Sequence, residues 1–249
     1  MLLRIGAAYI RRCIRCGTIS AAIPEAAFAA EVIPNVSRVQ FLDTIGTPAA
    51  AAPIEIPGIS RITGALSLGF KVLHGGRISY GQIANVTQEQ WAPNIRHSAH
   101  DRQKRLSAFV HHFNDFSFRA LQDFGEKLAN VHGIPPQSNP FAQIDTHLWR
   151  KGLSAEQRQP RFFSDVKAFE RELKRYMADW ADFDIAATHY AYGYDYLCTA
   201  DTGTSHQDSI FGPKYATQLD QFGVKNITLP KLARLCWSRY WVPLRSQNS

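Results

Sequence analysis

Several features that mark common classes of protein are missing from this sequence of 249 residues. It has no uninterrupted apolar run of about 18 residues, so we expect no membrane-spanning helix and no membrane partner. It also lacks the G-x-G-x-x-G, Walker A and G-x-S-x-G patterns, which disfavours a small-molecule α/β enzyme. Internal repeats and low-complexity segments are missing too.

Cysteine is scarce, with four residues in the whole chain. Cys13 and Cys16 form a C-x-x-C pair, but no second pair follows at the spacing of a zinc site. A redox interpretation would need a βαβ context, which residues 1–20 do not offer. We interpret the cysteines as reduced thiols of a cytoplasmic protein.

Acidic residues are missing from the first 20 positions, which carry Arg4, Arg11, Arg12 and Arg15. These arginines interrupt the continuous apolar segment that a secretory signal needs. We therefore predict that residues 1–36 are an N-terminal extension or leader. An organelle transit peptide, a mis-assigned start codon and a helix docked on the domain are the alternatives.

The composition is that of a globular protein with a basic surface. Apolar residues make up 45% of the chain, and 15 Phe, 9 Tyr and 5 Trp can fill a sizeable core. The formal net charge of +7 suits a polyanionic partner such as nucleic acid, because phosphates attract a basic face. Charge alone does not identify that partner.

Strand-like and helix-like patterns alternate along residues 37–245. Apolar segments predict strands at 37–44, 77–83, 194–201 and 224–229. Helical periodicity predicts helices at 59–76, 85–95, 98–131, 164–193, 212–223 and 230–241, with a second helix starting near Asp182 inside the segment 164–193. The alternation predicts an α/β fold of three layers (α/β/α) around a central, mainly parallel sheet. The segment at about 95–165 would be a helical insertion.

Four carboxylates fall at junctions of this pattern. Asp43 and Asp201 end predicted strands, Asp182 heads a predicted helix, and Glu89 lies in the first turn of another. Ligands of parallel sheets bind beyond the carboxyl ends of the strands, so the four side chains could meet at one edge. Clustered carboxylates need a divalent cation, and oxygen ligands select Mg²⁺ or Mn²⁺. Asp184 lies two residues from Asp182 and would point away from it on a helix.

Each of these residues also has a structural interpretation. Aspartate at a helix start is a common N-cap, and aspartate after a strand is a common turn residue. Glutamate in the first turn of a helix favours the helix dipole. Only the joint placement of the four carboxylates favours catalysis over these structural roles.

The segment ADFDIAATHYAYGYDYLCTAD at 181–201 resembles the C-terminal half of a PIN domain. In that family an aspartate precedes an Ile-Ala-Ala helix, and an apolar strand then ends in Thr-x-Asp. Asp182 matches the helix aspartate, and Thr199 and Asp201 match the Thr-x-Asp.

Two further segments carry the same resemblance. FLDT at 41–44 resembles the first-strand motif, with Asp43 as the first acidic ligand and Thr44 as its hydroxyl neighbour. ITLPKLARL at 227–235 resembles the last strand and helix. Glu89 matches by its position in the pattern rather than by a motif of its own. The resemblance makes residues 37–245 a single PIN-like domain.

The resemblance implies cleavage of RNA that depends on Mg²⁺ or Mn²⁺. The carboxylates of Asp43, Glu89, Asp182 and Asp201 would hold the metal, and Thr199 would position water or phosphate. The partners it implies are RNA, an antitoxin protein if the chain is a toxin, and a second copy of the chain. The alternative is a catalytically inactive PIN-like module that binds nucleic acid or protein.

A basic segment offers a place for RNA phosphates. It contains Arg150, Lys151, Arg158 and Arg161. Such segments are usually solvated loops, but in an RNA-binding protein these side chains would contact the phosphate backbone.

Overall fold

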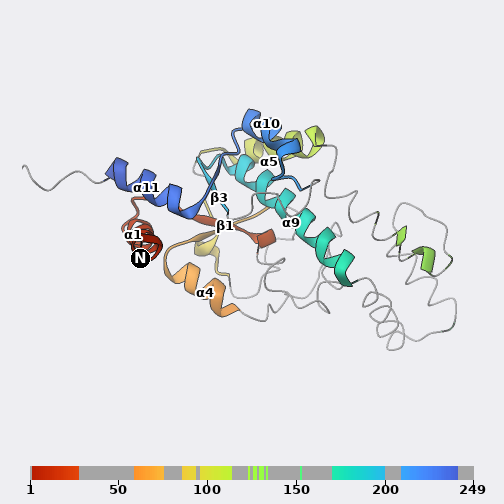
Figure 1. Ribbon diagram of the computed structural model, residues 1–249, viewed down its shortest axis with the longest axis horizontal. Coiled ribbons are helices and arrows are strands. Elements are labelled where there is room, and N and C mark those ends of the chain that lie inside the picture. Colours follow the sequence, from red (N-terminus) through yellow and green to blue (C-terminus); the bar gives the residue numbers. More distant parts are fainter. Residues whose placement is uncertain are drawn as a thin grey trace, which may run out of the picture.

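The structure is a computed structural model that describes residues 2–27, 59–75, 86–93, 96–113, 170–199 and 209–240, with a few isolated positions between 123 and 152 (Figure 1). The predicted strands at 37–44 and 77–83 lie outside the described residues. Within the described residues, every helix is too short or too polar to span a lipid bilayer.

Two short parallel strand pairs form the β-structure of the described residues. Strand β1 (Ala22–Pro24) pairs with β2 (Lys71–Leu73), and β3 (Leu197–Cys198) pairs with β4 (Asn226–Ile227). The last two match the predicted strands at 194–201 and 224–229, although both are shorter than expected. Parallel pairing agrees with the predicted sheet, whereas the full three-layer, PIN-like arrangement stays a prediction.

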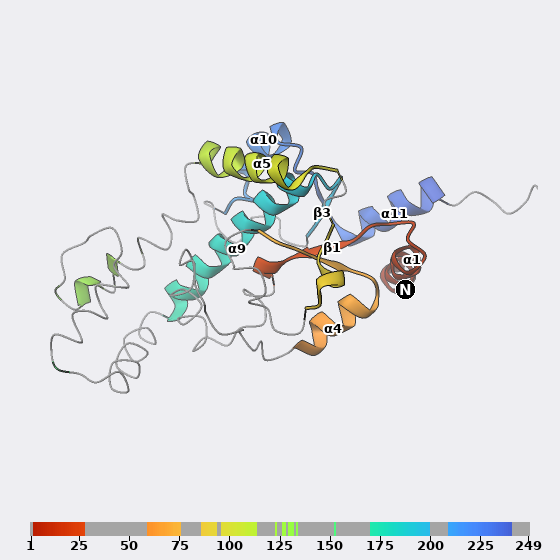
Figure 2. The ribbon, with the colours of Figure 1, turned by 180° about the vertical axis from the view of Figure 1, so that it is seen from behind.

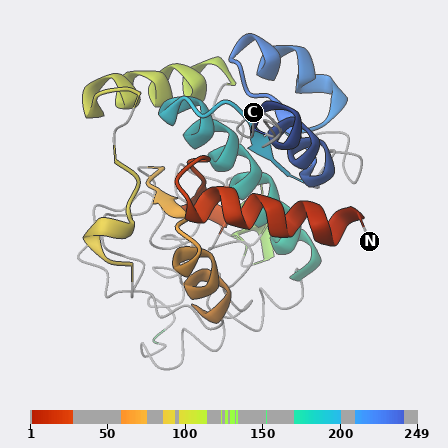
Figure 3. The same cartoon turned by 90° about the vertical axis from the view of Figure 1, so that its left-hand side faces the viewer.

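The helices lie around these strands. They are α1 (Leu2–Arg15), α4 (Ile59–Ser67), α5 (Ala99–His112), α9 (Glu170–Tyr192), α10 (Pro213–Gln221) and α11 (Leu229–Tyr240), with the short 3-10 helix η1 (Gln88–Gln90). Figures 1 and 2 show α5 and α10 beside α9 on one side of the strands and α4 on the other. Helices α1 and α11 lie side by side at one end of the molecule (Figure 3).

Local sequence signals fix the ends of three helices. The Ser98 hydroxyl accepts a hydrogen bond from the Asp101 backbone N–H at 3.1 Å and caps α5, at the start of the helix predicted at 98–131. Gly212 and Pro213 start α10, and Gly223, with φ of 70°, follows its end. The predicted helix at 85–95 is the single turn η1, which follows Thr87.

The prediction of one helix across 59–76 is wrong in its second half. Helix α4 ends at Ser67, and the chain reverses at Gly69, whose φ of 95° suits glycine. Residues Lys71–Leu73 then pair with β1 as strand β2. A three-residue strand is too short to show an alternation of apolar and polar residues. The helical spacing of the preceding apolar residues therefore extended the predicted helix across this strand.

The predicted break near Asp182 is also wrong. Helix α9 runs without interruption from Glu170 to Tyr192, and this stretch contains neither Gly nor Pro. Trp180 and Phe183 are fully buried on its inner face, so packing continues straight through the expected boundary. Asp182 therefore lies in the interior of a helix and does not serve as its N-cap.

An aromatic core joins α5, α9 and α10. The Phe109 ring packs within 5.7 Å of the rings of Phe183, Tyr190 and Phe222, measured between centroids. Small side chains at Ala186 and Ala187 let the neighbouring elements approach α9 closely, and both are buried. This core fixes α9, which carries several of the candidate functional residues described below.

Helix α1 packs against α11 through apolar and aromatic contacts. Ile10, Cys13 and Ile14 are buried on α1, and Cys236 is buried on α11. The rings of Tyr9 and Trp237 lie 5.2 Å apart. Part of the predicted N-terminal extension is therefore packed on the rest of the chain, in line with the alternative of a docked helix.

Candidate functional site

Several residues of the predicted site lie outside the described residues. They are Asp43, Asp201, Arg150, Lys151, Arg158 and Arg161. Three predicted residues can be placed, and they are Glu89, Asp182 and Thr199. Their positions divide between two cavities.

Asp182 and Thr199 line the same cavity, which we call the α9 cavity. Its volume is about 440 Å³, and its wall also includes Ile10, Ile185 and His189. Asp182 projects from α9, whereas Thr199 follows the carboxyl end of β3, where its backbone N–H donates to the Ile227 carbonyl at 3.2 Å. Two residues of the predicted set thus line one cavity although they come from different elements.

His189 adds a neutral imidazole to the α9 cavity. Its side chain is buried on α9, and this burial lowers its pKa from 6.5 to about 4, because a charged ring would lose its hydration. The Tyr196 backbone and the Asp195 carboxylate oppose that shift only in part. His189 is therefore uncharged at neutral pH.

Glu89 lies on a second cavity, which we call the β2-end cavity. This cavity has a volume of about 380 Å³ and is lined by Lys71, His74, Glu89, Trp91, Arg102 and Tyr192, among others. A hydrogen bond from the Thr87 hydroxyl lowers the pKa of the exposed Glu89 carboxyl, and the Lys71 charge lowers it further. Asp182 and Thr199 are not among the residues that line this cavity.

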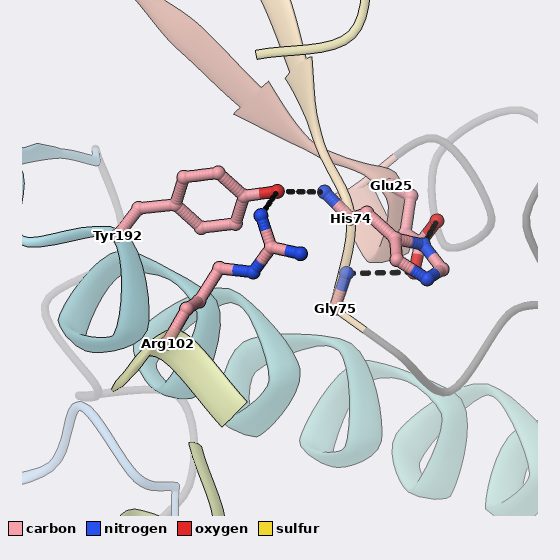
Figure 4. Close-up of polar contacts among 5 residues, drawn as sticks. All are labelled: Glu25, His74, Gly75, Arg102 and Tyr192. Carbon is pink, nitrogen blue, oxygen red and sulfur yellow. Dashed lines mark hydrogen bonds and ion pairs between the residues drawn. The ribbon is translucent and has the colours of Figure 1, made fainter. Parts of the chain in front are cut away.

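A buried carboxylate joins the carboxyl ends of β1 and β2 (Figure 4). Glu25 directly follows β1 and is fully buried. One of its oxygens accepts from the Gly75 backbone N–H at 2.8 Å, and the other lies 3.0 Å from His74 Nδ1. Both partners directly follow β2, so Glu25 bridges the two strand ends and orients the His74 ring.

Asp184 and Thr188 approach the same strand end from α9. They lie one helical turn apart, and both are buried. A Cβ atom placed on Gly75 would lie 2.5 Å from Asp184 Oδ2 and 2.9 Å from Thr188 Oγ1. Asp184 therefore points to the β2 end while Asp182 lines the α9 cavity, as their helical spacing predicts.

Tyr192 connects the β2 end to α5. Its hydroxyl accepts from the His74 backbone N–H at 3.2 Å and from Arg102 Nη1 at 3.0 Å (Figure 4). The Arg102 guanidinium carbon also lies 4.7 Å from the centre of the Tyr192 ring, a cation–π arrangement. Both contacts hold the Arg102 charge at the wall of the β2-end cavity.

Only part of the predicted metal-ligand set falls within the described residues. Within the described ranges, no three His, Cys, Asp or Glu side chains are grouped as metal ligands. Asp182 contributes one carboxylate to the α9 cavity, and the partners that the sequence assigns to it, Asp43 and Asp201, lie outside the described residues.

Sequence reasoning missed Glu25 and His74. Glu25 lies in a segment that resembles an Ala/Pro-containing connector, and His74 lies at the end of an apparent helix. The two residues have one feature in common that could have identified them. Each is a polar residue that directly follows a three-residue segment, and the structure pairs these two segments as strands.

Comparison with known protein families, curated proteins and solved structures gives no match to this chain.

Proposed function

We propose that the protein is a PIN-type ribonuclease that hydrolyses RNA phosphodiester bonds and depends on Mg²⁺ or Mn²⁺. One observation carries the proposal: Asp182 and Thr199, from two different elements, line a single cavity. They are the helix aspartate and the strand-end threonine of the sequence motif. Thr199 also follows the carboxyl end of a parallel strand, where α/β proteins place their ligands.

The two side chains suit different tasks in phosphodiester hydrolysis. The Asp182 carboxylate is a hard oxygen ligand of the kind that Mg²⁺ and Mn²⁺ prefer. The Thr199 hydroxyl can donate a hydrogen bond to a phosphate oxygen or accept one from water. A divalent metal, when bound, would lower the pKa of a water molecule and stabilise charge on the phosphate. Asp43 and Asp201 would complete its ligands, whereas Glu89, the fourth carboxylate of the predicted set, lines the other cavity and is left out of the proposed site.

Burial of His189 fits this assignment. A neutral imidazole adds no positive charge to the α9 cavity, so it does not oppose the binding of a metal cation there. The net charge of +7 further favours association with RNA.

The direct test is a cleavage assay with single-stranded RNA and DNA of the same sequence. We expect cleavage of RNA in Mn²⁺ or Mg²⁺, and none in EDTA. Cleavage that persists in EDTA would contradict the metal requirement. RNA that is bound but left intact in both metals would instead favour the inactive PIN-like binding module.

A further inference from the structure

We infer that the β2-end cavity binds a backbone phosphate of single-stranded RNA. The inference rests on the proposed function, since it names a substrate contact for the same protein. It concerns a different part of the molecule from the α9 cavity. It is also separate from the basic segment that the sequence suggested.

The first support is a pair of cationic side chains that line the cavity. Lys71 comes from β2 and Arg102 from α5, and both line the cavity together with His74. Lys71 Nζ donates to the Glu89 carbonyl at 2.6 Å, and Arg102 Nη1 donates to the Tyr192 hydroxyl. These bonds hold the ammonium and guanidinium groups at the cavity.

The second support is the way His74 is held. Its Nδ1 faces the buried Glu25 carboxylate, which can only accept a hydrogen bond when ionised. This contact holds the imidazole in one orientation beside the end of β2. The edge-on ring of Trp91, with centroids 5.9 Å apart, limits rotation of the imidazole further. The contribution of His74 is thus a fixed position at the cavity, whereas the cationic groups of the lining are Lys71 and Arg102.

The third support is the location and size of the cavity. Its lining runs from Lys71 on β2 to His74, which directly follows the carboxyl end of this parallel strand, and α/β folds bind their ligands near such ends. Its volume of about 380 Å³ falls within the range of small-ligand sites and accommodates a phosphate with part of its sugar. The Glu89 carboxylate is the one acidic group among the lining residues, and it opposes an anion.

The test measures binding of a 2′-O-methyl RNA hexanucleotide in EDTA by titration calorimetry. EDTA and the modified sugar separate binding from cleavage, so a failure here leaves the ribonuclease proposal intact. We expect Lys71→Gln and Arg102→Gln each to weaken binding about tenfold and to reduce the salt slope by about one. The matched control is Lys104→Gln, an exposed position on the same helix as Arg102 that does not line the cavity.

Two further binding measurements test the role of charge, one with another variant and one with an uncharged oligonucleotide. Glu89→Gln should tighten binding, because it removes the opposing charge from the wall. A hexanucleotide with uncharged methylphosphonate linkages should bind at least tenfold more weakly than the charged one, which identifies the backbone phosphate as the bound group.

Three results would overturn the inference. They are wild-type affinity in both Lys71→Gln and Arg102→Gln, an equal loss in Lys104→Gln, and equal binding of the uncharged oligonucleotide. Circular dichroism of each variant establishes that it is folded. If Arg102→Gln does not fold, Lys71→Gln alone is a sufficient test. We expect this variant to fold because Lys71 is only partly buried.

Discussion

Glu25 shows how a buried carboxyl group can find partners and position its neighbours. An ionised carboxylate without hydrogen bonds would be very costly in the interior. Here its two oxygens face a backbone N–H and an imidazole nitrogen from the end of β2. The same contacts fix the register of the two strand ends and the orientation of His74.

Gly75 is constrained by the same packing. A methyl group at this position would meet Asp184 Oδ2 at 2.5 Å and Thr188 Oγ1 at 2.9 Å, and both side chains are buried. We therefore expect Gly75→Ala to lower the free energy of unfolding by about 1–3 kcal/mol. Urea denaturation measures this change.

Gly64 provides the matched control for Gly75. It lies inside α4 with no atom within 4 Å of an added Cβ. Gly64→Ala should stabilise the protein by about 0.5–1 kcal/mol, because alanine loses less entropy in a helix. Equal effects of the two substitutions would contradict the packing described around Gly75.

His189 makes stability depend on pH. Its pKa is about 4 in the folded protein and about 6.5 in the unfolded chain, so below pH 6.5 only the unfolded chain takes up the proton. Stability is thus lost as the pH falls from 6.5 to about 4. The loss attributable to this group is about 3 kcal/mol.

Comparison with His189→Gln isolates that contribution. Urea unfolding of both proteins at pH 7 and pH 4.5 should show a larger loss for the wild type, because glutamine does not titrate. Parallel curves for the two proteins would show that His189 is not shielded from water as described.

At the scale of elements, the sequence predicts helices better than strands. The caps at Ser98 and at Gly212–Pro213 rest on local chemistry, so α5 and α10 begin where their sequences indicate. Strand β2 depends on pairing with β1, almost 50 residues away in the sequence. The local sequence of Lys71–Leu73 does not predict that pairing. Long-range pairing is the information that local patterns lack.

The candidate site shows the same difference between features that local sequence predicts and features that depend on long-range pairing. The motif around 181–201 predicts that Asp182 and Thr199 belong together, and both line one cavity. The pairing of Glu25 with His74 spans 49 positions and depends on the parallel register of β1 and β2. Sequence reasoning could not find it without first finding both short strands.

Helix α1 offers a test of whether the N-terminal segment belongs to the fold. Ile10 is buried on α1, beside the helix contacts with α11, and it lines the α9 cavity. Ile10→Ala should destabilise the protein by about 2–4 kcal/mol. Arg11→Ala, at an exposed position of the same helix, should change stability by about 0.5 kcal/mol or less. The measurement is the midpoint of thermal unfolding of each variant. Equal midpoints for the two variants would indicate that α1 is a detachable leader.

At the scale of the whole molecule, the two cavities have different roles in the proposed function, hydrolysis in one and substrate binding in the other. The α9 cavity contains the acidic and hydroxyl groups that hydrolysis would need, and the β2-end cavity contains the cationic groups that would hold the substrate. Helix α9 contributes to both, through Asp182 on one and Tyr192 on the other. A basic protein with this arrangement would attract RNA first by charge and then position one phosphate.

The most direct test of the account is the rate of RNA cleavage in Mn²⁺ by the wild type, Asp182→Asn and Asp220→Asn. Asp220 is an exposed aspartate on α10 that lines neither cavity, so it controls for loss of one negative charge. Asp182→Asn should lower the cleavage rate by roughly 100-fold or more, since it removes an interaction required in the transition state, while Asp220→Asn should match the wild type. Equal rates for all three proteins would contradict the assignment of Asp182 and, with it, the proposed ribonuclease site.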